Sequence, residues 1–468
     1  MAQMPRLAFL ASPEDQDPSI AGLAFLGALS AAGWKVQHFR SWACPQSSRP
    51  IGSITGFPGR HLDAWLMPPA VCRSVFLRGA RQADLAIIEG THRFSQIVAD
   101  PPGTSDCSDR STGKSPGSIG PLVEMLDLPT VIVLDCRSGE PAGLPLSTGQ
   151  ACAVVLDGIQ EIQNFQRLRV SFQEATGLPV IGGLELLPAV RAGLAAWPAG
   201  RPIPRELLEP LVQSFLKTAD WPLVSRLARS RPFPTPEQEG FEIPAWMLTS
   251  GERRFRVAYA QDEAFGGYFP DTLEAFELLG AELVEFSPLR SESLPRSVDL
   301  VMIGCGFPDQ HAARLSANFS LISELQAGAC RGLRIYAEGG GAVYLGRSMR
   351  IGDQVYPGAG ILPIDSVLGD ENGWPRPVER QLIQESWLAR SGTVVRGYRS
   401  GRWKLQPAPN PTDCPTRSGR LSAESDIVFR SQAIGSLVHL HLSALANVVS
   451  GFASQRKSNV GRLDSVVN

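Results

Sequence analysis

The sequence lacks several features that would place it in a special class of protein. Its eight cysteines include no C-x-x-C pair, so neither a disulfide framework nor a zinc site is expected, and reduced thiols in a cytoplasm are the default. The most apolar long stretch, residues 177–197, contains Glu185, Arg191 and two prolines, which argues against a membrane span. The first apolar run, residues 6–11, is too short for a secretory signal.

The chain also lacks an excess of charge of either sign. It has 44 basic and 46 acidic residues and a formal net charge of −2, so neither nucleic acid nor an anionic membrane is an expected partner. The composition, 43% hydrophobic and 19% charged, is typical of a soluble globular protein. A chain of 468 residues is too long for one ordinary core, and two to three domains are expected.

Short apolar runs alternate with helical patterns in the first half of the chain. Residues 20–33 have helical spacing and end at a glycine, which is a common helix stop. Continuous Val/Ile/Leu runs separated by helices indicate a parallel sheet that is covered on both faces. The predicted buried strands are residues 6–11, 34–39, 83–90, 129–136, 151–158 and 178–184.

A polar, proline-rich stretch, residues 228–246, interrupts this pattern and is the best candidate for a linker. A second α/β series follows it, with a helix predicted over residues 272–280. The strands predicted in this series are residues 255–260, 281–286, 298–304 and 333–338. We therefore predict two doubly wound α/β domains, residues 1–245 and 246–455, followed by a polar tail, residues 456–468.

Residues 334–346, RIYAEGGGAVYLG, predict a strand, a glycine turn and a helix. That is the layout of a nucleophile elbow, where a strained turn holds one reactive side chain at the edge of a sheet. The tip, however, is Gly339, which has no side chain. A second glycine loop, residues 301–309, and the late pair His439 and His441 complete the layout of a class I glutamine amidotransferase. Such an enzyme needs an elbow, an oxyanion hole and a histidine base.

Longer stretches of both halves resemble the cobyrinate a,c-diamide synthase family. In the second half the similar segments are RVAYAQDEAFGGYFPDTLEAFELLGAELVEFSPLR, VMIGCGFPD, YAEGGGAVYLG and HLHL, and they span most of residues 255–442. In the first half GRHLDAWLM, ADLAIIEG, GSIGPLVEMLDLPTVIVLDC and TGLPVIGGL match the dethiobiotin-synthetase-like ATPase half of that family. The ordered series of matches, rather than any short motif, carries the resemblance.

The resemblance implies a fold and a reaction. The implied fold is a dethiobiotin-synthetase-like, P-loop-like parallel sheet followed by the flavodoxin-type sheet of class I glutamine amidotransferases. The implied reaction belongs to cobalamin (vitamin B12) biosynthesis: ATP with Mg²⁺ activates the a- and c-carboxylates of a cobyrinate-type corrin, and ammonia converts them to amides. Glutamine hydrolysis through a cysteinyl thioester supplies that ammonia. A cytoplasmic ligase is implied, and a homodimer is compatible with it.

The residues of the glutaminase site are carried over one at a time. Gly339 occupies the position of the family's nucleophilic cysteine, so the group that attacks glutamine is missing. The resemblance makes His439 the catalytic base, and it gives the backbone amides of Gly340 and Gly304 to the oxyanion hole. Cys305 lies in the glycine loop where the family has Gly. A packed thiol is favoured there over a replacement nucleophile.

The phosphate loop of the family is missing as well. Residues 12–19, SPEDQDPS, replace a glycine-rich loop ending in Gly-Lys-Thr, whose amides and lysine hold the phosphates. Glu14, Asp15 and Asp17 would occupy the anion site at the helix start and repel a triphosphate, although an acidic loop that caps a helix is an ordinary feature. The Gly-Lys-Ser within residues 99–118 lacks the first glycine of a phosphate loop, so a flexible polar insertion is predicted.

Two carboxylates match family positions. Glu89 ends the strand ADLAIIE and corresponds to a glutamate near Mg²⁺, and Asp63 in HLDAW corresponds to an aspartate on the substrate side. Carboxylates at strand ends point into the crevice where α/β sheets bind ligands, but either could cap a loop instead. The aspartate expected after residues 36–40 is missing. His439 and His441 would share one face of a strand, and base plus structural partner is favoured over a metal site.

Two hypotheses of function follow. In the first, the chain is a cobyrinate a,c-diamide synthase that uses free ammonia rather than glutamine. In the second, it is a catalytically inactive paralogue that binds a tetrapyrrole, glutamine or a partner protein on the retained fold. The loss of two motifs favours the second hypothesis. The extent of the resemblance favours the first, which we adopt as the family role.

Overall fold

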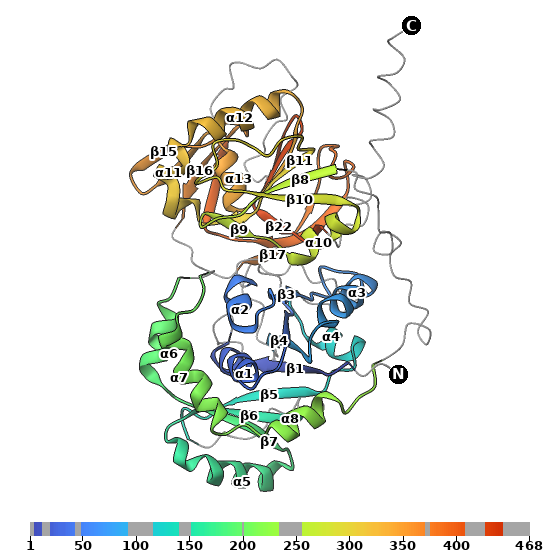
Figure 1. Cartoon of the computed structure of the whole chain (residues 1–468), viewed down its shortest axis with the longest axis vertical. Helices are drawn as coiled ribbons and strands as arrows, with labels where there is room; N and C mark the ends of the chain where they lie inside the picture. The colour runs from blue at the N-terminus through green and yellow to red at the C-terminus, as the bar shows by residue number, and fades with distance from the viewer. Residues whose placement is uncertain are drawn as a thin grey trace. The chain divides into compact units, whose positions relative to one another are not determined.

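The computed structural model describes residues 4–11, 19–42, 48–91, 116–139, 151–198, 201–233, 255–369, 375–407 and 426–442. The described residues up to 233 form one compact unit, and those from 255 onward form a second (Figure 1). Within these residues no helix is both long and apolar enough to cross a membrane.

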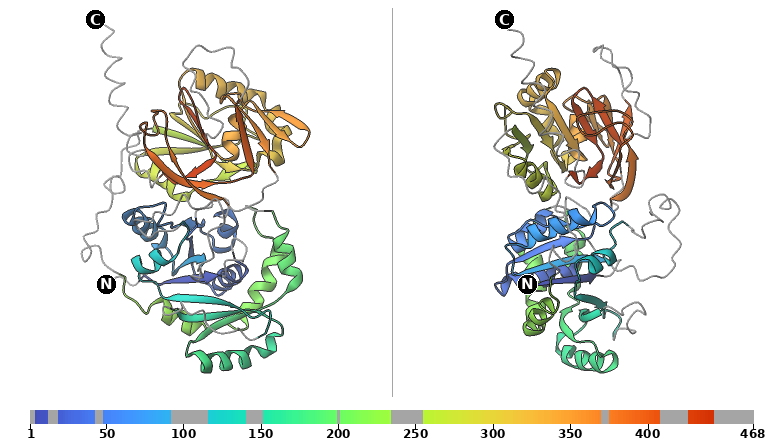
Figure 2. Two further views of the ribbon diagram at one scale, coloured as in Figure 1. Left: turned by 180° about the vertical axis from the view of Figure 1, so that it is seen from behind. Right: turned by 90° about the vertical axis from the view of Figure 1, so that its right-hand side faces the viewer.

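The first unit is built on a seven-stranded sheet in which every pairing is parallel (Figure 2). Its strand order is β3 (Arg60–His61), β2 (Val36–Arg40), β4 (Leu85–Thr91), β1 (Arg6–Ala11), β5 (Thr130–Asp135), β6 (Ala151–Ile159) and β7 (Val180–Glu185). All six residues of β1 are buried, as expected for a central strand covered on both faces. The predicted parallel sheet is therefore confirmed.

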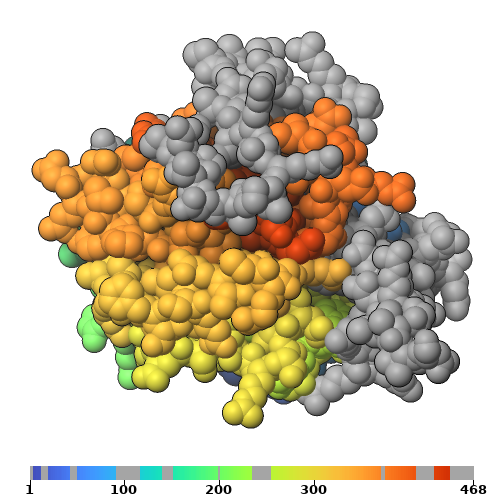
Figure 3. Space-filling model, turned by 90° about the horizontal axis from the view of Figure 1, so that it is seen from above, coloured from blue at the N-terminus to red at the C-terminus, as the bar shows by residue number. Residues whose placement is uncertain are grey.

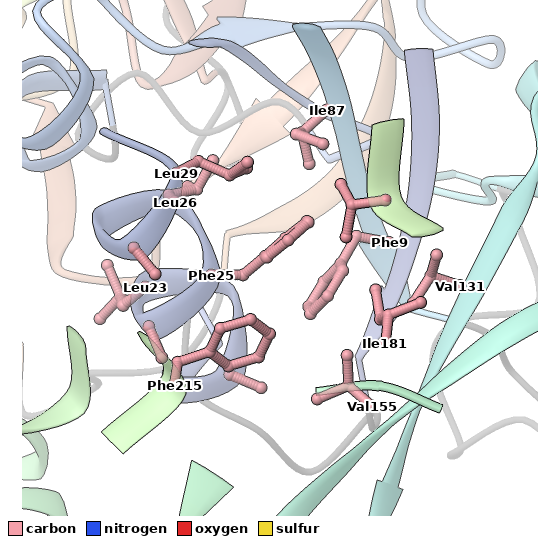
Figure 4. Packing of buried hydrophobic residues seen from close by; sticks show 14 of the residues in the cluster. Phe9, Leu23, Phe25, Leu26, Leu29, Ile87, Val131, Val155, Ile181 and Phe215 are labelled. Atoms are coloured by element: carbon pink, nitrogen blue, oxygen red, sulfur yellow. The ribbon is translucent and has the colours of Figure 1, made fainter. Parts of the chain in front are cut away.

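The helices of this unit complete its core. They are α1 (Ile20–Ala31), α2 (Ser48–Thr55), α3 (Pro69–Ala80), α4 (Gly120–Met125), α5 (Phe165–Thr176), α6 (Pro188–Ala195), α7 (Arg205–Leu216) and α8 (Trp221–Ala228). Figure 4 shows Phe9 of β1, Phe25 of α1 and Phe215 of α7 packed together. The ring centroids of Phe9 and Phe25 are 5.1 Å apart, and those of Phe25 and Phe215 are 5.5 Å apart. Burial of large aromatic rings is a main source of core stability, so this packing fixes α1, and with it the start of α1, against the sheet.

The second unit has a six-stranded sheet. Its order is β10 (Ala281–Phe286), β8 (Phe255–Ala260), β11 (Leu300–Ile303), β13 (Arg334–Glu338), β21 (Ala433–Ser436) and β20 (Ile427–Arg430). The first five strands pair in parallel in the order 2-1-3-4-5, which is the flavodoxin-type arrangement, and β20 adds an antiparallel edge. The flavodoxin-type α/β fold predicted for this half is confirmed.

Helices and three smaller sheets surround the six-stranded sheet. The helices are α10 (Pro270–Leu278), α11 (Ala312–Ala317), α12 (Phe319–Cys330) and α13 (Gly340–Leu345). One smaller sheet pairs β12 (Cys305–Gly306) with β9 (Phe265–Gly267). The second has the order β15 (Gln354–Pro357), β14 (Ser348–Ile351), β16 (Ile364–Leu368) and β19 (Trp403–Pro407). The third has the order β17 (Arg376–Gln381), β18 (Val394–Arg399) and β22 (Val438–Leu440). Gold and orange residues, which carry α12 and the strands after it, form much of this unit's surface in Figure 3.

The segment of residues 435–442 is divided between two sheets. Its first residues belong to β21 in the six-stranded sheet, and β22 lies in the antiparallel sheet with β18. His439 lies within β22, whereas His441 follows the end of that strand. The expectation that both histidines lie within one strand is therefore wrong.

Candidate active site

The strand, turn and helix of the elbow are present. The strand β13 ends at Glu338, α13 begins at Gly340, and Gly339 joins them with φ 51° and ψ −118°. A positive φ is a conformation that side chains disfavour and glycine adopts without penalty. The Gly339 N–H donates to the Ser436 carbonyl at 2.7 Å, and its own carbonyl accepts from the Val343 N–H at 3.2 Å. The turn is thus held by the neighbouring strand and by its own helix, without any reactive side chain.

Two functional side chains lie directly beside this turn. A Cβ placed on Gly339 would be 2.8 Å from Cε1 of His439 and 3.6 Å from Sγ of Cys305. The first distance is shorter than real Cβ contacts, so the imidazole occupies space that a side chain at position 339 would need. A side chain at position 339 would therefore require the imidazole of His439 to move.

Cys305, His439 and Glu338 form a compact cluster. The Cys305 thiol lies 2.6 Å from Nδ1 of His439. The Glu338 oxygen Oε2 lies 3.9 Å from the thiol and 3.8 Å from the same Nδ1. All three side chains are buried. A thiol, an imidazole and a carboxylate therefore converge on one point at the tip of the elbow.

The carboxylate of this cluster is held in place from behind. Its second oxygen, Oε1, accepts hydrogen bonds from the Leu440 N–H at 3.1 Å and from the Tyr336 hydroxyl. Burial, followed by the charge of Glu338, raises the pKa of Tyr336 well above its usual value, so this hydroxyl stays a neutral donor. Among the residues that the structure describes, His439 is the only basic side chain at ion-pair distance from Glu338.

The two glycines expected to form an oxyanion hole have close neighbours. The Gly304 N–H donates to the Tyr268 hydroxyl at 2.9 Å. A Cβ on Gly340 would lie 2.6 Å from both the Gly306 carbonyl oxygen and Pro308 Cδ, so the glycine loop packs tightly against the elbow. The two loops are brought together, while the role of their amides stays a prediction.

His441 has surroundings of its own. Its Nε2 lies 3.9 Å from Asp271 Oδ2, and its ring centroid is 4.8 Å from that of Phe269. Burial lowers the pKa of His441 to about 3, so the ring is neutral at physiological pH. A pocket that Phe269, Thr272 and Glu338 help to line lies beside the cluster. His441 is thus a structural neighbour of this pocket.

In the first unit, Glu89 lies near the carboxyl end of β4 and is hydrogen bonded on both oxygens. Oε1 accepts from the Ser19 N–H at 3.1 Å and from the Ser19 hydroxyl at 2.5 Å. Oε2 lies 2.8 Å from Nε2 of His38, which belongs to the neighbouring strand β2. Ser19 also caps α1, because its hydroxyl accepts from the Gly22 N–H at 3.0 Å. The carboxylate thus joins β2, β4 and the start of α1.

The environment of Glu89 predicts an acid-dependent loss of stability. Burial alone would raise its pKa, but the hydrogen bond from His38 and the positive charge of Arg40 lower it from 4.5 to about 2. A depressed folded-state pKa stabilises the fold above pH 4.5, and this contribution is lost as the pH falls toward 2. At about 1.4 kcal/mol per pKa unit, the loss is about 3 kcal/mol.

Urea unfolding between pH 4.5 and pH 2 should show this loss of stability, and Glu89→Gln should flatten that part of the profile. If the unfolding free energy of the variant falls with pH as steeply as that of the unaltered chain, the prediction is contradicted.

Asp63 has a capping role in the structure. It is fully buried, and its Oδ1 accepts the Trp65 N–H at 2.9 Å and the Leu66 N–H at 3.3 Å. These bonds are those of an aspartate that caps a turn. Its expected place on the substrate side stays a prediction.

Some predictions lie outside the described residues. These include all of the acidic loop except Ser19, the Gly-Lys-Ser segment, most of the predicted linker and the polar tail.

Ser41 stands directly after β2, where the resemblance implies an aspartate. Its hydroxyl donates a hydrogen bond to the Gly117 carbonyl at 2.8 Å.

Sequence reasoning assigned no role to three residues of these clusters. Glu338 immediately precedes Gly339, and its place next to the turn was the available signal. Ser19 is the last residue of the acidic loop, and its position before an apolar helix is typical of an N-cap. His38 lies in a buried strand, and nothing in its local sequence indicates its contact with Glu89, 51 positions away.

Comparisons with known proteins agree with this geometry. Residues 256–446 match the family described as the CobB/CobQ-like glutamine amidotransferase domain. The chain is 28% identical over 363 residues to the cobyrinate a,c-diamide synthase of Salmonella typhimurium, covering 74% of each protein. The synthase of Methanosarcina acetivorans is 25% identical, covering 94% of this chain and 92% of that protein. The synthase of Synechocystis is 27% identical, covering 92% and 89%. The resemblance expected from the sequence is confirmed.

Proposed function

Because the chain is similar to cobyrinate a,c-diamide synthases along most of its length, we propose that it amidates the a- and c-carboxylates of a cobyrinate-type corrin in cobalamin biosynthesis. We propose further that the reaction depends on ATP and takes ammonia as its nitrogen donor. Similarity over 94% of the chain, which includes both units, is the observation that supports the family reaction. A match confined to the second unit would have supported only a glutaminase-like fold.

The elbow supports ammonia rather than glutamine as the donor. Hydrolysis of glutamine through a thioester needs a nucleophile at the strained turn, and Gly339 has none. The imidazole of His439 lies against Gly339, in space that a side chain there would need. Free ammonia does not require this step, because it can attack an activated carboxylate directly.

The first unit supports the use of ATP with Mg²⁺ in part. Mg²⁺ prefers oxygen ligands, and the Glu89 carboxylate and the Ser19 hydroxyl place two such ligands at the start of α1. The donor chemistry of these two residues suits the ion, which would displace the hydrogen bond that they make with each other. ATP would supply the phosphoryl group that activates a corrin carboxylate. The chain's own contribution is to keep Glu89 ionised through His38 and to fix it against Ser19.

The second candidate function is a ligand-binding paralogue without turnover. The acidic residues Glu14, Asp15 and Asp17, in the place of a phosphate loop, favour it. The two functions differ in one measurable property, which is consumption of ATP that is coupled to amide formation.

Amide formation on cobyrinate tests the proposal. The purified chain is incubated with cobyrinate, Mg-ATP and either ammonium or glutamine, and the corrin is analysed by mass spectrometry. We expect conversion of carboxylic acid to amide with ammonium and ATP together, and none when ATP is omitted. Glutamine alone should give no product above the buffer control. An unchanged corrin under every condition, together with no ATP binding by calorimetry, would overturn the proposal in favour of the paralogue.

A further inference from the structure

The cluster at the tip of the elbow has the composition of a metal site. We propose that Cys305, Glu338 and His439 bind a divalent transition metal of the zinc type. Thiolate, imidazole and carboxylate are the three side-chain groups that hold Zn²⁺ in proteins, and three such ligands with one open position are typical of zinc sites that bind a further ligand. The three donor atoms all lie within 4.8 Å of one another.

Two of the three distances between the donor atoms are close to those that tetrahedral zinc requires, and the third is shorter. Usual zinc–ligand bond lengths place sulfur, nitrogen and oxygen donors about 3.4–3.6 Å apart. The oxygen of Glu338 is 3.9 Å from Sγ of Cys305 and 3.8 Å from Nδ1 of His439. Sγ and Nδ1 are 2.6 Å apart, so a metal would enter between them and widen this one separation by about 1 Å.

The direction of the carboxylate distinguishes a metal site from a catalytic relay. In a relay, the carboxylate holds the ring nitrogen opposite the nucleophile and orients the imidazole. Here Glu338 approaches Nδ1, the nitrogen that also faces the Cys305 thiol. All three groups therefore point to a common centre, as ligands do.

The surroundings of the cluster support the same conclusion. Ligating carboxylates are usually oriented by hydrogen bonds from outside the site, and the Tyr336 hydroxyl and the Leu440 N–H provide these for Glu338. A buried carboxylate also needs a positive partner, which a metal ion would supply. A pocket that Gly304, Thr272 and Glu338 help to line lies beside the cluster.

Metal binding has a defined proton balance. The ligand forms are the thiolate of Cys305, the ionised carboxylate of Glu338 and the neutral imidazole of His439 with Nδ1 unprotonated. The thiol proton is released to solvent when the sulfur–metal bond forms, so affinity should rise with pH.

Metal content and cobalt spectroscopy test the proposal on the full chain. The protein is stripped with a chelator, reloaded with Zn²⁺ or Co²⁺ and passed through gel filtration. We expect about one bound Zn²⁺ per chain from this cluster. With Co²⁺, we expect a sulfur-to-cobalt charge-transfer band. Cys305→Ser should abolish the band. Both Cys305→Ser and Glu338→Gln should lower the amount of retained metal at least about tenfold, since even the loss of a residue that only orients a ligand has an effect of this size.

The matched control is Cys330→Ser, because Cys330 is an exposed cysteine at the end of α12. It should retain the metal and the cobalt band in full. Circular dichroism establishes that each variant is folded, and Glu338→Gln serves as a second test if Cys305→Ser fails to fold. No metal retained by the unaltered chain, or equal retention by Cys305→Ser, would overturn the proposal. Labelling of Cys305 by an electrophilic glutamine analogue would also overturn it, in favour of a nucleophile. None of these outcomes depends on corrin amidation.

Discussion

The double variant Gly339→Cys/Cys305→Gly is expected to hydrolyse glutamine at a rate at least about 100-fold above that of the unaltered chain. This factor is the lower end of what a positioned base contributes to proton transfer. The exchange places a thiol at the strained turn and a glycine in the neighbouring loop, which is the arrangement that the sequence resemblance implies for an active elbow. His439 is already beside the turn, so the variant would regain a nucleophile and a base in contact.

The second substitution is needed because the two positions compete for space. A Cβ at position 339 would lie 3.6 Å from Sγ of Cys305 and closer still to His439, so the single variant Gly339→Cys would place two sulfur atoms against one imidazole. We expect that variant to have much lower glutaminase activity than the double variant. Removing the Cys305 thiol gives the imidazole room to move away from the turn.

Gly339→Ala/Cys305→Gly is the matched control for this experiment. It carries the same Cβ at a positive φ, where a side chain costs about 1–3 kcal/mol, but it has no nucleophile. Ammonia release from glutamine is the measurement, and thermal unfolding reports whether each variant folds. A folded double variant that is no faster than the alanine control would show that the elbow is unable to support a nucleophile.

Glu89→Ala is expected to destabilise the first unit by about 3 kcal/mol, the upper end of the cost of leaving a buried hydrogen-bonding group without its partner. The substitution leaves His38 fully buried without its carboxylate and removes the acceptor of the Ser19 hydroxyl. Equilibrium unfolding in urea is the measurement. Glu89→Gln keeps the shape and one acceptor oxygen, so its cost should be smaller. Under the proposed function, both variants should also lose ATP-dependent amidation.

Glu174→Ala is the control for these variants. Glu174 is an exposed residue of α5, and surface substitutions of this kind usually change stability by less than about 0.5 kcal/mol. If Glu89→Ala costs no more than Glu174→Ala, then the contacts of Glu89 with His38 and Ser19 do not stabilise the unit.

The architecture was largely predictable because its signals are local. Runs such as residues 6–11 and 129–136 are largely apolar, which is typical of strands buried on both faces, and the structure places β1 and β5 there. The elbow was predictable for the same reason, since a strand, three glycines and a helix follow one another directly. The small sheets after α13 were not predicted, because strands such as β17 are short, polar and only partly buried.

The contents of the sites were less predictable because they depend on contacts between distant residues. Cys305 and His439 are 134 positions apart, and they meet only because β12 and β22 both approach the tip of β13. No C-x-x-C or similar spacing marks such a site, so a zinc-type cluster was not predictable from local sequence patterns. Likewise, Glu89 was predicted as a metal-side carboxylate from its strand-end position, while its partner His38 was not identified.

The source of the amide nitrogen tests most directly whether a chain whose elbow lacks a nucleophile takes ammonia instead of glutamine. The chain is given a cobyrinate-type corrin, Mg-ATP, ¹⁵N-ammonium and unlabelled glutamine together, and the isotope content of the amide product is measured by mass spectrometry. We expect product in which the amide nitrogen is ¹⁵N throughout. Product that carries unlabelled nitrogen from glutamine would contradict it.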